Sequence, residues 1–546
     1  MKNLIISLLL IICTSTFTFA ATFVVNNNGD TNDANTSDNI CADSSGNCTL
    51  RAAIQQANAS PGDDTITFAL VTPATITLAN GELRIDSNIT IDGLGARNLI
   101  IDGNNASGVL SIGGFGGTFI IVRISGLTVT NGNSGGRTGG GILNYGTLNL
   151  SDVTIRNNVS LNSGGGIRNS GTLNLSDVTI RNNVSSISGG GISNTGTLNI
   201  NRSTINNNTS ASSNFSGGGI ANFNSANISN TTISNNSAGR GGGISNSLEV
   251  QSASPRMTLN NVTISNNTAF SRGGGISNEG VGSIAIVRNT IIAQNNGFFD
   301  DINVLFRSSD IDGSFNSLGN NFIGNGTNGS GFINGVNGDK VGTSANPIDP
   351  LLGALQNNGG QTDTRALLAG SPAIDMGNNC VFTATCLSNN PIQPLTTDQR
   401  GIGFSRFIGS AVDIGAFEVQ SPPTPTPTPT PIPTPTPTPT PTPQTCTPST
   451  TVSEGDLFAG GIASFGVSSG AGSVTVDHVN AGTGLQSLTV VGTPINAVVN
   501  IPAFTPGTFA PIVVTFTTPN PTLPTDFTLR AASTFHAAFI RVRCSP

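Results

Sequence analysis

One fifteen-residue segment of this chain occurs twice without change. GTLNLSDVTIRNNVS fills residues 146–160 and again residues 171–185, a spacing of 25 residues. Looser copies surround it, because the tetrapeptide GGGI begins at six positions separated by 25, 25, 28, 24 and 32 residues: Gly139, Gly164, Gly189, Gly217, Gly241 and Gly273. A repeat of this length predicts a stack of similar coils, each of which buries its apolar face only against its neighbours.

The content of one copy indicates β-structure. Leu148 and Leu150 lie on one face of an expected strand, and Val153 and Ile155 lie on one face of the next. Glycine triplets and paired asparagines both tolerate the left-handed backbone of sharp corners, and asparagines at one position of successive coils can form an amide ladder. Leucine-rich repeats are the main alternative, but no helical periodicity appears. We therefore predict an all-β fold, a right-handed parallel β-helix with coils of about 25 residues.

The two ends of the β-helix and the tail are predicted to differ from the coils. A cap covers residues 21–84 and contains a short helix, the β-helix covers 85–340, and a distinct segment covers 341–420. Residues 421–443 are almost pure Thr-Pro and predict an extended polyproline II linker. Alternating strands in residues 444–546 predict a C-terminal antiparallel β-sandwich.

Composition and the N-terminus indicate export. Residues 1–20 have the pattern of a signal peptide, with Lys2 ahead of an apolar run; a lipoprotein site at Cys13 is disfavoured by Ile12. Outside this leader no run of about 20 apolar residues predicts a membrane-spanning helix. The net charge of −7 gives no basic footprint for nucleic acid. We expect an extracellular or cell-surface protein, which includes association with an outer membrane.

Six cysteines remain after the leader, and an even number in an exported chain favours disulfides. Proximity predicts the pairs Cys41–Cys48, Cys380–Cys386 and Cys446–Cys544, although six cysteines allow about 15 pairings. Free thiols, or a metal site at the two short pairs, are the alternatives.

Three parts of the chain resemble families of bacterial surface proteins. The sequence CTLRAAIQQAN at residues 48–58 resembles the CSLREA motif, with Thr49 and Ala52 departing from it, and the GGGI coils with paired asparagines resemble polymorphic outer-membrane protein repeats. Four blocks in order, DPLLGALQNNGG, GSPAID, DQRG and DIGAFE, resemble the choice-of-anchor Q domain, with Gln361 and Arg365 departing from its pattern. This resemblance implies a domain without catalysis that closes a β-helix ahead of a surface-sorting tail.

Clustered acidic residues are candidates for catalysis, since hydrolases and lyases need clustered carboxylates. Asp152 and Asp177 are equivalent turn positions and Arg202 takes that position one coil later, so a charge ladder explains them together with Arg156 and Arg181. The weaker candidates are Asp300 and Asp301, with Asp310 and Asp312, in an irregular coil. No His occurs in the coils, and no Lys precedes Lys340 there. We therefore predict no catalytic site and no required cofactor.

An Asp-rich loop before the helix is a weak candidate for Ca²⁺, which prefers oxygen ligands. Its aspartates are Asp30, Asp33, Asp38 and Asp43, whose spacing fits no EF-hand. Turn formation by Asp and Asn is the competing interpretation.

Two functional hypotheses follow. The favoured one is a non-enzymatic surface or secreted protein, adhesive or structural, whose solvent faces contact a polysaccharide or a cell surface. The alternative is a carbohydrate-active β-helix enzyme, a lyase or glycoside hydrolase, acting on extracellular polysaccharide.

Overall fold

The structure is a computed structural model and describes residues 20–420 apart from 115, 117–118, 213–216, 249–253, 298, 302–303, 307–308 and 387–392, together with strand segments between 447 and 545. The predicted leader, the Thr-Pro segment and Cys446 lie outside these residues. The chain divides into two compact units, Met1–Thr426 and Pro427–Pro546.

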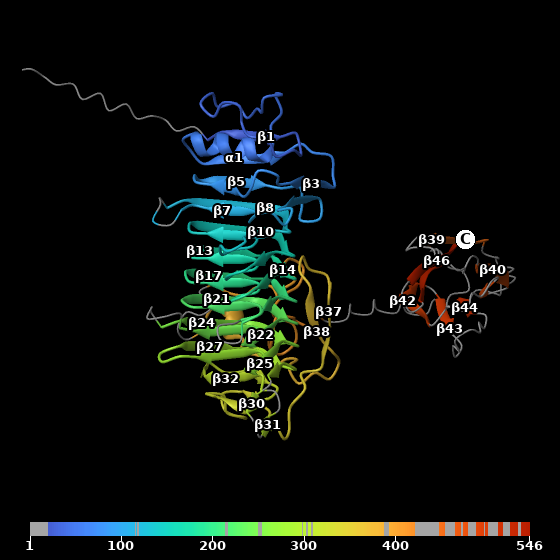
Figure 1. Cartoon of the computed structure of the whole chain (residues 1–546). Coiled ribbons are helices and arrows are strands. Elements are labelled where there is room, and N and C mark those ends of the chain that lie inside the picture. The colour runs from blue at the N-terminus through green and yellow to red at the C-terminus, as the bar shows by residue number, and fades with distance from the viewer. Residues whose placement is uncertain are drawn as a thin grey trace, which may run out of the picture. The chain divides into compact units, whose positions relative to one another are not determined.

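The first unit is a parallel β-solenoid (Figure 1). Its described strands form three parallel sheets of 18, 10 and 6 strands. One coil, residues 167–185, shows the path: β12 (Ile167–Asn169) lies in the ten-stranded sheet, β13 (Thr172–Ser176) and β14 (Thr179–Arg181) in the large sheet, and β15 (Val184–Ser185) in the small one. The predicted parallel β-helix architecture is confirmed.

The remaining strands of the solenoid follow the same order. In the large sheet they are β1 (Thr22–Val25), β2 (Asp64–Phe68), β3 (Ala74–Thr77), β5 (Ile89–Asp92), β6 (Leu99–Asp102), β8 (Ile121–Thr130), β10 (Thr147–Arg156), β17 (Thr197–Asn201), β18 (Thr204–Asn206), β21 (Ser225–Ser234), β24 (Arg256–Ser265), β27 (Ile284–Arg288), β28 (Ile291–Ala293), β33 (Asn316–Ser317), β34 (Phe322–Ile323) and β36 (Lys340–Val341). In the ten-stranded sheet they are β4 (Leu83–Ile85), β7 (Leu110–Ile112), β9 (Ile142–Asn144), β16 (Ile192–Asn194), β20 (Ile220–Asn222), β23 (Ile244–Ser247), β26 (Ile276–Glu279), β32 (Ile311–Ser314) and β35 (Asn328–Ser330). In the small sheet they are β11 (Val159–Ser160), β19 (Thr209–Ser210), β22 (Ser237–Arg240), β25 (Thr268–Arg272) and β29 (Asn296–Gly297).

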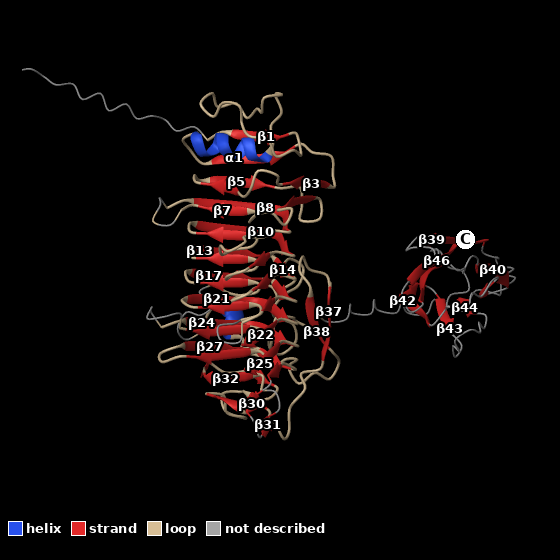
Figure 2. Ribbon diagram, in the orientation of Figure 1, coloured by secondary structure: helices blue, strands red, loops and turns tan. Residues whose placement is uncertain are grey.

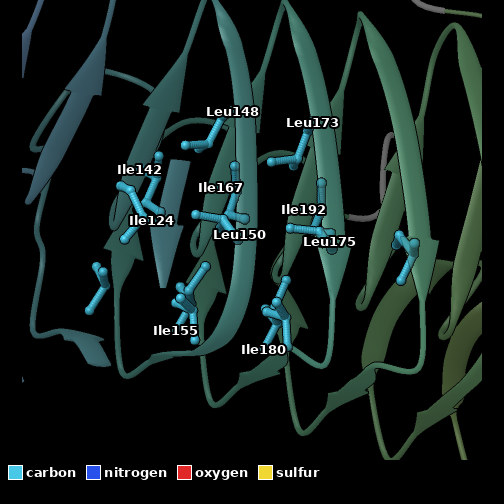
Figure 3. Close-up of a cluster of buried hydrophobic side chains, with 14 of the residues drawn as sticks. Ile124, Ile142, Leu148, Leu150, Ile155, Ile167, Leu173, Leu175, Ile180 and Ile192 are labelled. Carbon is cyan, nitrogen blue, oxygen red and sulfur yellow. The ribbon is translucent and has the colours of Figure 1, made fainter. Parts of the chain in front are cut away.

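The interior of the solenoid is a column of aliphatic side chains. The register stacks each residue on its copy one coil later, so that Leu148 pairs with Leu173 and Ile167 with Ile192. Figure 3 shows these side chains filling the space between the sheets. Because every coil leaves its apolar faces open above and below, burial depends on the neighbouring coils.

Two buried asparagine ladders run along the solenoid, as the repeated asparagines predicted. In each ladder a side-chain amide donates to the amide oxygen of the next coil at 2.7–3.0 Å. The first ladder comprises Asn144, Asn169, Asn194, Asn222, Asn246 and Asn278; the second comprises Asn158, Asn183, Asn208, Asn236, Asn267 and Asn295. The residue before each member of the second ladder takes the left-handed conformation; it is an asparagine in five coils, for example Asn182 at φ 56°, and Gln294 in the last.

The glycine triplets bring neighbouring coils together at a corner. The first glycine of each has positive φ, such as Gly164 at 73°. A Cβ on the third glycine, Gly166, would lie 2.6 Å from the carbonyl oxygen of Gly191 and 3.1 Å from Nδ2 of Asn183. No side chain fits there without moving backbone.

We therefore expect Gly166→Ala to lower the free energy of unfolding by about 1–3 kcal/mol through overpacking. Gly136→Ala is the matched control, because a Cβ there meets nothing within 4 Å. Urea unfolding followed by circular dichroism measures both. Equal stability of the two variants would contradict the tight corner.

A helix covers the N-terminal end of the solenoid (Figure 2). α1 (Leu50–Ala59) begins after Thr49, whose hydroxyl accepts the N–H of Ala52 at 3.1 Å. Its buried face includes Leu50, Ile54 and Ala57, which join the core of the first coils. The predicted helix and its capping position are confirmed.

Residues 341–420, here called the strap, fold back along the large sheet. The strap contains β37 (Leu352–Gln356) paired antiparallel with β38 (Thr364–Leu367), and the short helix α2 (Cys380–Thr383). Figure 1 shows β37 and β38 beside the coils. Ahead of it, β30 (Phe299–Asp301) and β31 (Val304–Phe306) form a hairpin in the irregular coil.

The second unit contains two four-stranded antiparallel sheets among its described segments. The strands are β39 (Thr447–Ser453), β40 (Phe465–Gly470), β41 (Ser473–His478), β42 (Ser487–Ile495), β43 (Ala497–Asn500), β44 (Ile512–Phe516), β45 (Thr525–Ala532) and β46 (Ala537–Ser545). β39 pairs with β46, so the first and last of these strands are neighbours. The sandwich packing and the Cys446–Cys544 disulfide stay predictions.

Candidate functional site

The outer face of the large sheet carries rows of identical polar side chains. In β13, Leu173 and Leu175 point inward, so that Thr172, Asn174 and Ser176 point outward. In-register pairing stacks Asn149, Asn174, Asn199 and Asn227 on one another. Each amide nitrogen donates to the previous amide oxygen, at 2.9, 2.8 and 3.0 Å along the row. These form a third asparagine ladder, which is accessible to solvent.

This outer ladder is the floor of a groove of about 660 Å³, here called the amide groove. The groove spans coils from β5 to β21 and is walled on one side by the strap residues Gln393 and Leu395. Amide and hydroxyl side chains recur along its lining: Asn149, Asn174, Asn199, Asn201, Asn227, Ser125, Ser151, Ser176 and Ser229, with Thr90, Asp92 and Arg123 towards the N-terminal end. Apolar residues also line it, namely Ile124, Leu150, Leu175, Ile200 and Leu395. One polar pattern thus repeats over successive coils.

A second groove, of about 880 Å³, lies where the strap meets the other half of the large sheet. We call it the arginine groove, because Arg97, Arg156 and Arg181 line it. Thr128, Thr154 and Thr179 line it from the strands, and the strap contributes Asn357, Gly360, Gln361 and Asp363.

The turn between the two halves of the large sheet carries the first set of acidic candidates. Asp152, Asp177 and Arg202 occupy one position of successive coils, with φ of 50°, 59° and 48°. Arg202 binds Asp177 through two contacts of 2.9 and 2.6 Å. Partial burial raises the pKa of Asp152, while the backbone N–H of Ala96 donates to its carboxylate. The predicted charge ladder is confirmed for Asp177 and Arg202.

The structure does not bring the second set of candidates together. Asp300 and Asp301 lie in the hairpin strand β30, and their side chains lie outside the described residues. Asp310 ends the second buried ladder, where it accepts from Asn295 at 2.8 Å, and burial raises its pKa to about 7. Asp312 lies outward beside Glu279, and burial raises its pKa too. Asp310 and Asp312 therefore lie in different surroundings and do not form one acidic cluster.

The Asp-rich loop uses its carboxylates in turns. Asp30 pairs with Arg51 of α1 at 2.8 Å, whereas Asp33, Asp38 and Asp43 each accept a backbone N–H two residues on. Within the described residues no three of His, Cys, Asp and Glu lie close enough to hold a metal ion. The loop therefore does not gather the four aspartates around one point.

Two of the predicted disulfides are present, Cys41–Cys48 and Cys380–Cys386. The first closes the loop ahead of α1, and the second closes the α2 turn of the strap. Both pairs were separated by only a few residues in the sequence, which made their pairing predictable.

The DQRG and DIGAFE blocks of the strap form a buried polar network. Arg400 binds Asp398 at 2.7 Å and lies between the rings of Phe404 and Phe417, 4.0 and 3.8 Å from their centroids. Gln399 reaches the solenoid, where it donates to Thr204 at 2.9 Å. These motif residues hold the strap to the coils.

Arg406 is the deepest charge of this network, with no exposed side-chain surface. It donates to the carbonyl oxygens of Gly415 and Ala416 and to Asn230 of the solenoid, and lies 3.6 Å from Glu418. Burial raises the pKa of Glu418 to about 8, against the opposing effect of Arg406. The strap is thus attached through charges that are costly to bury unpaired.

Comparisons with family models, curated proteins and solved structures find no match to this chain. The described residues include no helix long and apolar enough to cross a membrane.

Proposed function

We propose that this chain is an exported, non-enzymatic β-solenoid that binds an extended polysaccharide in its amide groove, as an adhesive or structural protein. The outer asparagine ladder carries this proposal. Asn174 and Asn199 each donate one side-chain N–H to the ladder, so the second N–H of each amide is available to a ligand. Successive rungs are about 4.8 Å apart, so a polymer lying along the axis meets the same donors repeatedly.

The setting of the groove supports an extracellular role. The two short disulfides are typical of an oxidising compartment. The predicted leader and the resemblances to CSLREA and choice-of-anchor Q domains also favour export. In this proposal the Thr-Pro segment is a spacer and the C-terminal β-sandwich is the terminal module. A right-handed coil agrees with the usual hand of connections between parallel strands.

We expect the full chain to be retarded in gels that contain a neutral polysaccharide, tested over a β-glucan, a xylan and a glucomannan. Asn174→Leu with Asn199→Leu should weaken this binding about tenfold or more, because several hydrogen bonds of about 0.5–1.5 kcal/mol each are lost. Thr172→Val with Thr197→Val is the matched control on the same strands, two residues away and outside the groove lining. Absence of retardation throughout the panel, or equal effects of both pairs, would contradict the amide groove as the site.

A further inference from the structure

The arginine groove carries charge that the fold does not require. Arg156 and Arg181 stack in register on adjacent coils. Like charges opposite one another destabilise a sheet. The flanking coils place Thr130 and Asn206 at the same position, so the solenoid accepts neutral side chains there. The duplication of the fifteen-residue segment explains why the arginine occurs twice. It does not explain why this position is positively charged in the first place.

The described residues give neither guanidinium a partner. Within the described part of the chain, the side chains of Arg156 and Arg181 make no hydrogen bond and no ion pair. The nearby carboxylate of Asp177 is already held by Arg202. With Asp177 neutralised by Arg202, two carboxylates, Asp152 and Asp363, remain among the described lining residues. Three arginines line the same groove, so positive charge exceeds negative charge there. The groove therefore offers guanidinium groups to a ligand.

The floor of the same groove is a row of threonine hydroxyl groups. In later coils the same row binds the strap. Further along this row, Thr204 donates to the carbonyl oxygen of Asp363 at 2.5 Å, and Thr232 donates to Gln399 at 2.6 Å. Thr154 and Thr179 precede them in the row and are left open by the strap. The uncovered part of the row can thus contact ligand oxygens as the covered part contacts the strap.

We infer that the arginine groove binds a stretch of acidic polysaccharide, with Arg156 and Arg181 holding its carboxylates and Thr154 and Thr179 contacting its hydroxyls. The planar fork of arginine matches a carboxylate through paired hydrogen bonds. The described lining includes no aromatic side chain on which the bases of single-stranded nucleic acid could stack. This inference extends the proposed function to a second site and a charged ligand, and it does not require the amide groove to be occupied.

Affinity electrophoresis of the full chain in gels containing polygalacturonate tests the inference. Arg156→Thr with Arg181→Asn copies the neutral side chains of the flanking coils, so it should fold, and it should weaken binding at least tenfold. The dependence of affinity on salt should also become shallower. Arg84→Gln with Arg137→Gln is the control, because it removes the same charge from exposed sites outside both grooves. It should bind like the unaltered chain.

The outcomes separate this inference from the proposed function. Asn174→Leu with Asn199→Leu should leave polygalacturonate binding intact while it weakens retardation by the neutral polymer. Failure of the neutral panel alone overturns the amide groove and leaves the arginine groove standing. Absence of polygalacturonate binding, equal affinity of the Arg156/Arg181 variant, or equal binding of polyglutamate or single-stranded oligothymidine would overturn the inference.

Discussion

Asn183→Leu is expected to lower the free energy of unfolding by about 3 kcal/mol or more. The side chain of Asn183 is fully buried and lies in the middle of the second ladder. Its oxygen accepts from both the backbone and the side-chain nitrogen of Asn158, and its nitrogen donates to the carbonyl oxygen of Ile155 at 3.0 Å. Leucine would remove these three hydrogen bonds and the ladder bond to the amide oxygen of Asn208, and the side-chain nitrogen of Asn158 would keep only the carbonyl oxygen of Val129. Buried polar groups that lose a partner cost about 1–3 kcal/mol each.

Asn182→Gly is the matched control for this variant. Asn182 is the adjacent member of the pair, is exposed, and needs only a residue that tolerates φ of 56°. We expect a change of less than about 1 kcal/mol there, measured by urea unfolding with circular dichroism. A large loss at Asn182 together with a small loss at Asn183 would contradict the assignment of the two asparagines to corner and ladder.

Arg406→Ala is expected to release the strap at a cost of about 3–5 kcal/mol, because the fully buried guanidinium donates to two carbonyl oxygens and to Asn230 and is the positive charge among the surrounding carboxyl groups. Glu418 and the nearby Asp413 would be left as buried acids, and the carbonyl oxygens of Gly415 and Ala416 would lose their donor. Thermal unfolding and limited proteolysis measure the effect, with new cleavage expected between residues 341 and 420.

The control for strap release is Arg123→Ala, at an exposed arginine on the large sheet, where a change within about 0.5 kcal/mol is expected. A strap that stays resistant to protease in the Arg406 variant would show that its attachment does not depend on the buried network. Cleavage confined to the solenoid would show the same.

The coil architecture could be predicted because it depends on local and periodic features of the sequence. The 25-residue spacing fixes which residues stack, and the hydrogen bonds of the ladders repeat that spacing between Asn144, Asn169 and Asn194. Left-handed corners followed from Gly and Asn, and the two close cysteine pairs followed from proximity. These features depend on neighbours within one coil or one period.

The grooves could not be predicted, because they depend on where the strap lies. Thr154 and Thr204 look alike in the sequence, yet Thr204 is covered by the strap and Thr154 is open. The contact of Gln399 with Thr204 joins residues 195 positions apart, which no local pattern encodes. In the sequence Asp310 resembles the other acidic candidates, because its role at the end of a buried ladder appears only when the coils are stacked.

The central claim, binding without cleavage, is tested most directly by measuring new reducing ends and unsaturated uronides after the full chain is incubated with a polysaccharide that retards it. We predict no product above the buffer control. Product formation that disappears in an Asp300→Ala/Asp301→Ala double variant would contradict the claim and establish the enzyme alternative.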